Sequence, residues 1–157
     1  MKRTDEETAQ IYEKHVTMIY RICFTYMKNA SDTEDAVQDT FYRLIKTNPT
    51  FENDEHQKAW LIRVATNVCK NKLTHWWRKR EDVDLYQQTV GECQKANDTL
   101  EVIMSLPDKY KTVIYLYYYE GYTSVEIAKI LNKPNSTIRN HLHEARELLR
   151  VKLGDDF

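Results

Sequence analysis

The chain has 157 residues, which is enough for one compact domain or two small ones. Charged residues make up 30% of the sequence, and only three glycines and three prolines interrupt it, a composition typical of helical proteins. No stretch approaches the roughly 18 apolar residues of a membrane span, and the first residues lead into no signal-peptide core, so we expect a cytoplasmic protein.

The cysteines and charges narrow the function classes further. Cys23, Cys69 and Cys93 lie far apart and form no CxxC pair, which disfavours a disulfide framework or zinc knuckle and favours reduced thiols. The formal net charge is -1, but residues 31–39 hold four acids and no base, while residues 69–80 hold five bases and no acid. Such segregation indicates one positive and one negative partner, although solvated helix faces are the plainer alternative.

Apolar residues recur at helical spacing from the start of the chain. The first helix is expected to bury Ile11, His15, Met18, Ile19, Ile22 and Tyr26. Ser31 and Glu34 form a capping box that predicts the start of a second helix. Its expected core residues are Ala36, Val37, Phe41, Leu44 and Ile45. Residues 47–56 are then predicted to form a loop.

A third helix is predicted from about Lys58 to Trp77, with two contrasting faces. One face gathers Leu61, Val64, Ala65, Val68 and Trp76. The opposite face gathers Arg63, Asn67, Lys70 and Thr74, with Asn71 and Arg78 beside them. Cations can neutralise phosphates, an amide can read a base edge, and Phe51, Trp76 and Trp77 offer aromatic surfaces for unstacked bases. Taken alone, this pattern favours an ordinary polar helix face.

The last part of the chain holds two short helices joined at a proline. Residues 81–97 lose the periodicity and are interpreted as a linker, and helical pattern resumes at about Asp98. Thr123 and Glu126 form a capping box for a helix expected to bury Val125, Ile127, Ala128 and Leu131. Pro134 breaks that helix. Asn135 or Ser136 is expected to cap the next helix, whose buried face is Ile138, Leu142, Ala145 and Leu149.

This arrangement predicts a helix-turn-helix, in which the second helix enters the major groove of DNA through its early exposed residues. Those residues are Arg139, Asn140, His141 and His143, with Arg146 one turn further on. A plain helical hairpin is the alternative. The coincidence of a cap, a small residue, a proline and a basic second helix favours DNA binding.

Three segments, in this order, resemble the extracytoplasmic-function (ECF) sigma factors, the small two-domain class of sigma-70-type bacterial RNA polymerase subunits. They are "DTEDAVQDTFYRLIK", "AWLIRVATNVCKNKL" and "LPDKYKTVIYLYYYEGYTSVEIAKILNKPNSTIRNHLHEAR". The resemblance covers nearly everything except residues 1–10 and the linker. It implies an all-α fold of two small helical domains: sigma domain two at residues 1–80, a flexible linker at 81–97, and sigma domain four at 98–157.

The resemblance also implies roles for individual residues. It assigns binding of core RNA polymerase to Asp35, Gln38, Asp39 and Phe41. It assigns recognition and melting of the minus-ten promoter element to Phe51, Arg63, Asn67, Lys70 and Asn71. It assigns recognition of the minus-thirty-five element to Ser136, Thr137, Arg139, Asn140, His141, His143 and Arg146. Ser136 stands where the family usually has glycine, and His141 stands where a basic residue is common.

We therefore expect a sigma factor whose partners are core RNA polymerase, promoter DNA and an anti-sigma factor, with no membrane insertion of its own. Catalytic, cofactor and metal sites are not expected, because there is no Gly-rich phosphate loop and no paired nucleophile and base. His141 and His143 would also point roughly 200° apart on a helix. The alternatives are a stand-alone dimeric helix-turn-helix regulator and an RNA-binding adaptor that uses residues 71–80.

Overall fold

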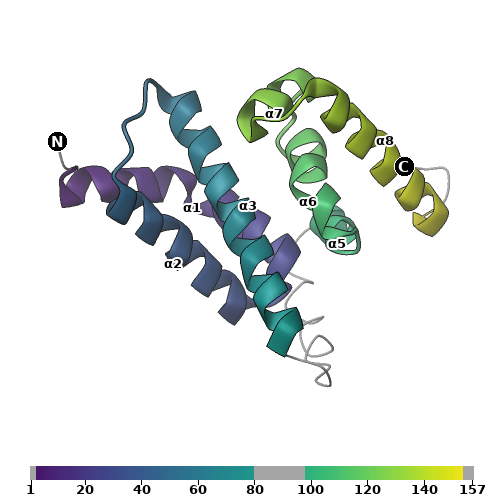
Figure 1. The fold of residues 1–157 in the computed structure, drawn as a ribbon, viewed down its shortest axis with the longest axis horizontal. Coiled ribbons are helices and arrows are strands. Elements are labelled where there is room, and N and C mark those ends of the chain that lie inside the picture. The colour runs from purple at the N-terminus through teal and green to yellow at the C-terminus, as the bar shows by residue number, and fades with distance from the viewer. Residues whose placement is uncertain (1–2, 80–97, 154–157) are drawn as a thin grey trace.

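The computed structural model describes residues 3–79 and 98–153, and within these ranges the protein is helical without a strand, as predicted. The predicted linker, residues 81–97, lies outside the described residues. The first group of helices comprises α1 (Asp5–Met27), α2 (Ala30–Thr47) and α3 (Asp54–Lys79). The second group comprises α5 (Asp98–Met104), α6 (Asp108–Ile114), the π-helical turn η2 (Tyr115–Tyr119), α7 (Ser124–Leu131) and α8 (Asn135–Leu153). Figure 1 shows the two groups side by side.

The first group is a three-helix bundle in which α1 packs against both α2 and α3. A capping box starts α1, because the Thr4 hydroxyl accepts from the Glu7 amide while the Glu7 carboxylate accepts from the Thr4 amide. The six residues predicted to face the core from this helix are all buried, which confirms the periodicity.

Two predicted helix starts in this group are wrong. The cap of α2 is Asn29 and not Ser31: its side-chain oxygen accepts from the Asp32 amide at 2.8 Å, directly after Lys28 turns the chain in a left-handed conformation. An asparagine beside that turn takes the capping position before Ser31 is reached. Similarly, α3 begins at Asp54 rather than near Lys58, because the Asn53 side chain accepts from the His56 amide at 2.8 Å. The loop therefore spans only residues 48–53.

The second group contains the predicted helix-turn-helix. The capping box of Thr123 and Glu126 is confirmed, and Asn132 ends α7 in a left-handed conformation with φ 55°. The prediction that Asn135 or Ser136 caps α8 is wrong, because the helix already begins at Asn135 and the Pro134 carbonyl accepts from the Ile138 amide at 3.2 Å. The buried face of α8 is as predicted and consists of Ile138, Leu142, Ala145 and Leu149.

Two residues expected in the core lie on the surface. Ile45 is 52% exposed and Val125 is 51% exposed, since each sits at the margin of its helix's apolar face. In α7 Ile130, which was not predicted to face the core, is buried, whereas Val125 is not. The apolar face of a helix is wider than the area that its neighbouring helices cover. Residues at the margin of that face are therefore predicted to be buried but remain exposed.

The two helical groups share one continuous hydrophobic core, through contacts of α1 with α5 and α6 and of α3 with α7. Polar side chains are buried at this junction as well. Thr112 on α6 hydrogen-bonds both the Tyr26 hydroxyl at 2.8 Å and the Thr66 hydroxyl at 3.0 Å. Lys111, only 1% exposed, donates to the Thr25 carbonyl in the last turn of α1 at 2.7 Å. The groups are therefore joined by specific hydrogen bonds as well as by apolar contact.

Candidate polymerase and nucleic-acid interfaces

The predicted polymerase-docking residues of α2 form an exposed stripe along one face of the helix. Asp35, Gln38 and Asp39 all face solvent, at the spacing that places residues on one side of a helix. Tyr42, 60% exposed, and Ile45 continue the stripe by one and two turns. The stripe thus combines carboxylates, an amide and exposed apolar surface. Such a composition suits a basic partner with an apolar centre.

Phe41 does not belong to this exposed stripe. Its side chain is 6% exposed and packs edge-on against the Tyr12 ring of α1, with 4.8 Å between ring centroids. Any contribution of Phe41 to docking would pass through the support that it gives to α2. The exposed aromatic residue on this surface is Tyr42, which the sequence analysis did not select.

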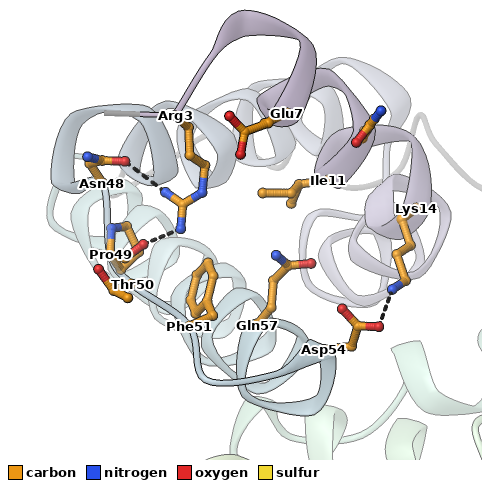
Figure 2. Close-up of a pocket in the computed structure, with 11 residues that line it drawn as sticks. Arg3, Glu7, Ile11, Lys14, Asn48, Pro49, Thr50, Phe51, Asp54 and Gln57 are labelled. Atoms are coloured by element: carbon orange, nitrogen blue, oxygen red, sulfur yellow. Dashed lines mark hydrogen bonds and ion pairs between the residues drawn. The ribbon is translucent and has the colours of Figure 1, made fainter. Parts of the chain in front are cut away.

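The loop of residues 48–53 borders a hollow between α1 and the start of α3. Figure 2 shows Phe51, Gln57 and the Arg3 guanidinium surrounding it, with the Lys14–Asp54 ion pair of 2.9 Å at one edge. The hollow has a volume of about 520 Å³. Phe51, predicted to contact the minus-ten element, packs edge-on against Trp60 with its ring partly exposed. An aromatic ring, an amide and a cation therefore converge on one open cavity.

A buried histidine holds the amide of this hollow. His15 on α1 is 5% exposed, and its Nε2 lies 3.1 Å from the Gln57 Oε1. Burial lowers the pKa of His15, so the ring is neutral at neutral pH and its Nε2–H donates to the amide oxygen. The Gln57 amide nitrogen is then left to donate to another acceptor.

The other predicted minus-ten residues lie on the polar face of α3, and part of that face meets the second helical group. Asn67 and Asn71 are exposed. Arg63, in contrast, donates through Nη1 to the Ile130 carbonyl of α7 at 2.8 Å. Lys70 is half-buried, and burial together with the nearby Lys133 lowers its pKa.

A basic cleft separates the two groups along this face. It has a volume of about 220 Å³ and is lined by Arg63, Asn67 and Lys70 of α3 and by Lys109 and Lys133 of the second group. The structure therefore brings three of the predicted minus-ten residues of α3 together, while the exposed Asn71 is not part of the cleft lining. It also places two further cations of the second group beside them, and it leaves Phe51 at the separate hollow.

The helix-turn-helix presents its predicted DNA-reading residues at the start of α8. Arg139, Asn140 and His143 are exposed on the side of the helix opposite the buried Ile138, with Ser136 exposed and Thr137 partly exposed in the first turn. These side chains are free to approach a groove, and an arginine followed by an asparagine suits hydrogen bonding to base edges.

His141 and Arg146 are held more firmly. The His141 ring packs edge-on against Tyr110 at 5.5 Å between centroids, and burial together with Lys133 lowers the pKa of His141. Arg146 lies over the Tyr117 ring at 5.0 Å, and its Nε donates to the Tyr118 hydroxyl at 2.8 Å. Both side chains fasten α8 to neighbouring helices, so they are presented to a ligand in fixed positions.

Sequence reasoning missed two further cations. Arg3 belongs to the opening residues, which the resemblance did not cover, yet it reaches the 48–53 loop. Lys111 was not singled out because a lysine in an amphipathic helix is expected to face solvent. The available signal was weak: α1 has no basic residue in its last turn, so a cation from elsewhere in the chain can satisfy its terminal carbonyls.

Comparison with known proteins shows which family the chain belongs to. Residues 11–81 match the family model of Sigma-70 region 2, and residues 97–149 match that of Sigma-70, region 4. The chain is 30% identical to the ECF RNA polymerase sigma-E factor of Haemophilus influenzae, over 78% of this chain and 75% of that protein. The chain belongs to the ECF sigma factors. It is also 29% identical to the ECF sigma factor SigW of Bacillus subtilis, over 99% of this chain and 94% of that protein.

Solved structures of other proteins share this fold. The sigma factor RpoE of Bartonella quintana, solved in complex with the anti-sigma factor NepR, superposes with a TM-score of 0.73 at 20% identity, over 97% of this chain and 99% of that one. CnrH, solved in complex with the cytosolic domain of CnrY, gives 0.70 at 21% identity, over 98% and 92%. The likeness extends over both helical groups of this ECF sigma factor.

Membership of this family fixes the general activity. An ECF sigma factor is a specificity subunit and not an enzyme: it binds core RNA polymerase and directs promoter-specific initiation of transcription. The predicted sigma-factor function is thus confirmed, and a stand-alone dimeric regulator is not favoured. Among the residues that the structure describes, no helix has both the length and the apolar composition to cross a membrane.

Proposed function

We propose that this sigma factor divides its work between residues 1–80 and residues 98–157. The first part docks on core polymerase through α2 and recognises the minus-ten element through Phe51 and the polar face of α3. The second part reads the minus-thirty-five element through the start of α8. The protein acts in the cytoplasm, where the polymerase and its promoters are found.

The observation that carries this proposal is the distribution of charge over separate surfaces. The exposed carboxylates of Asp35 and Asp39 lie on α2, whereas the arginine, lysine and amide side chains suited to DNA lie on α3 and α8. A basic protein surface and a nucleic acid can therefore be bound at the same time, on different faces. Asp39 is partly neutralised, because the Lys72 Nζ of α3 lies 2.8 Å from its carboxylate.

Promoter recognition requires the two helical groups to move apart. The two promoter elements are separated by about 25 base pairs, which is roughly 85 Å of B-DNA at 3.4 Å per base pair. In the structure the two groups are in contact, an arrangement that we call closed: Arg63 donates to the backbone of α7, and the groups share a core. We infer that binding of polymerase and promoter replaces this junction and frees the polar face of α3.

An anti-sigma factor is a further proposed partner. Both solved relatives named above are complexes with an anti-sigma factor or with the cytosolic domain of a second protein. The same fold and the same two groups are present here, so an inhibitory protein that stabilises the closed arrangement would keep this chain from polymerase.

The decisive experiment measures the affinity of the purified chain for core polymerase. Asp35→Lys should weaken binding by about tenfold or more, because it places a cation against a basic partner, and it should reduce the salt dependence of binding. Glu101→Lys, an equal change of charge at an exposed position of α5, is the matched control and should bind like wild type. Unchanged affinity of Asp35→Lys would refute the docking surface. Self-association and tight binding to a palindromic duplex without polymerase would instead favour the regulator.

A further inference from the structure

We propose that Arg3 is a positioning residue for minus-ten recognition: it fixes Phe51 and the backbone of the 48–53 loop so that the adjoining hollow accepts one unstacked nucleobase. The inference rests on the proposed role of Phe51 in minus-ten binding and adds a residue outside the recognised motifs. Arg3 acts through the loop and is not assigned a contact with DNA.

Three contacts connect Arg3 to the loop. Its Nη1 donates to the Asn48 side-chain oxygen at 2.9 Å, and its Nη2 donates to the Pro49 carbonyl. Its guanidinium carbon lies 4.9 Å from the centre of the Phe51 ring. Figure 2 shows the guanidinium reaching from the chain just before α1 across to Asn48 and Pro49. One planar cation thus holds the first two residues of the loop and the aromatic ring that follows, a geometry that favours arginine over lysine.

The start of α1 explains why Arg3 points toward the loop. Thr4 is the cap residue and has an extended backbone, with φ -72° and ψ 160°. The reciprocal hydrogen bonds between Thr4 and Glu7 fix that conformation. The chain before Thr4 therefore leaves the helix axis, and Arg3 is directed sideways over the end of α2. Asn48, its partner, is the left-handed residue that ends α2.

Arg3 anchors the end of the loop that begins at Asn48. Asn48 has φ 50°, a conformation that an asparagine tolerates but that a short loop does not by itself enforce. Farther along, the Glu52 amide donates to His56 Nδ1 at 3.1 Å, and Phe51 packs edge-on on Trp60. Arg3 supplies the constraint on the side of the loop opposite to α3.

The hollow has the size and chemistry for a single base. Its volume of about 520 Å³ lies within the range of small-ligand pockets, roughly 300–1,000 Å³. Phe51 offers a ring for stacking, and Gln57, oriented by His15, offers amide N–H donors to a base edge. Enzymes and binding proteins that capture extruded bases use this combination of aromatic surface and edge-directed hydrogen bonds. If the loop shifts, both features lose their relative placement.

The test uses holoenzyme assembled from core polymerase and the full chain. A single-stranded DNA pool randomised over the minus-ten element first identifies the preferred sequence and the position whose base matters most. Binding is then measured to that oligonucleotide and to the same oligonucleotide with an abasic site at that position. The ratio of the two affinities reports base capture separately from contacts with the phosphates.

Arg3→Ala should lower affinity for the oligonucleotide with the base by about fivefold to thirtyfold and leave affinity for the abasic one within about twofold. Arg3→Lys should restore little of this ratio, because an ammonium cannot hold Asn48, Pro49 and Phe51 together. In a Phe51→Ala background, Arg3→Ala should cause no further loss. Arg150→Ala, which removes an exposed arginine paired with Glu147, is the matched control and should behave like wild type.

The outcomes separate this inference from the proposed function. Equal losses on both oligonucleotides, with full rescue by Arg3→Lys, would make Arg3 a phosphate contact and overturn its positioning role. An unchanged ratio in Arg3→Ala, with a normal preference in wild type, would also overturn it while leaving minus-ten recognition intact. A wild-type holoenzyme with no preference for the base would instead refute the proposed role of the loop and of Phe51.

Discussion

Arg139 projects into solvent from the start of α8, while its neighbour Ile138 is fully buried. This contrast places the guanidinium where it can bond a base edge in the major groove. Arg139→Ala should therefore relax the preference at one or two positions of the minus-thirty-five element, at a cost of about 1–3 kcal/mol for the preferred base pair. A selection from a promoter library, performed with wild-type and variant holoenzyme, measures this directly.

Arg146→Ala provides the contrast for that experiment. Arg146 is held against Tyr117 and Tyr118, about two turns beyond Arg139, and is proposed to contact a phosphate. Its loss should weaken all upstream elements alike and leave the selected motif unchanged. An unaltered motif with Arg139→Ala would show that another residue reads the base.

Asn67 is exposed between Arg63 and Lys70, where its amide can hold a base that has lost its partner. We expect Asn67→Ala to lower transcription mainly by slowing open-complex formation. Permanganate reactivity of promoter thymines measures the opening, and a pre-melted template should recover part of the lost transcription. Wild-type reactivity in the variant would contradict this role.

At the scale of the element, Lys111 of α6 serves as the C-terminal cation that α1 lacks. Burial lowers the pKa of Lys111 to about 8 from 10.5, despite the Asp108 carboxylate at 3.1 Å. In this range the unfolded chain binds the proton more tightly than the folded chain, so the free energy of unfolding should rise as pH increases through it. This gain in the free energy of unfolding is complete above pH 10.5, where Lys111 is neutral in both the folded and the unfolded chain. It is lost as the pH falls through about 8, where the buried amine takes up its proton.

Lys111→Met tests this linkage, because methionine fills similar space without a titrating group. Chemical denaturation at about pH 7.5 and about pH 9.5 should show that wild type gains stability relative to the variant, by up to about 3 kcal/mol over the whole window. Lys109→Met changes an exposed lysine of the same helix and should show no such relative gain. Parallel pH profiles of wild type and Lys111→Met would contradict the assignment.

The spacing of residues along the sequence predicted a helix correctly wherever a single residue could fill a given position, such as the N-cap. The capping box at Thr123 and the buried stripe of α8 followed from the sequence because spacing alone determines them. Ser31 failed as a cap because Asn29, two residues earlier, reaches the free amide first. Such competition is settled by the turn before the helix, and periodicity contains no information about that turn.

At the scale of the whole molecule, the sequence predicted two helical domains but not their junction. The bonds from Tyr26 to Thr112 and from Lys111 to Thr25 each join residues 86 positions apart. No local spacing relates such partners. For the same reason the sequence placed Arg63 on a DNA-facing surface without revealing that α7 occupies it, and it could not connect Arg3 with the 48–53 loop.

Opening of this junction can be measured by energy transfer between two dyes. The dyes are attached through Ser31→Cys on α2 and Glu147→Cys on α8, since both residues are exposed and each lies in a different group. The native Cys23 and Cys69 are fully buried and should not be labelled. With Cys93 replaced by serine, we expect transfer to fall when core polymerase is added. Asp35→Lys, which is expected to bind polymerase about tenfold or more weakly, should need correspondingly more polymerase for the same fall in transfer. Unchanged transfer on saturating wild type with polymerase would show that the groups stay together.

The bond from Arg63 to the Ile130 carbonyl also has a consequence for competition among sigma factors. If only an open chain engages polymerase, the apparent affinity falls by the fraction of chains that are open, about tenfold when one chain in ten is open. A sequence change that weakens the junction would then raise this factor's share of a limited polymerase pool without altering any residue that touches polymerase. The ability of this protein to compete for polymerase would thus depend partly on α7, which lies far from α2, the helix proposed to dock.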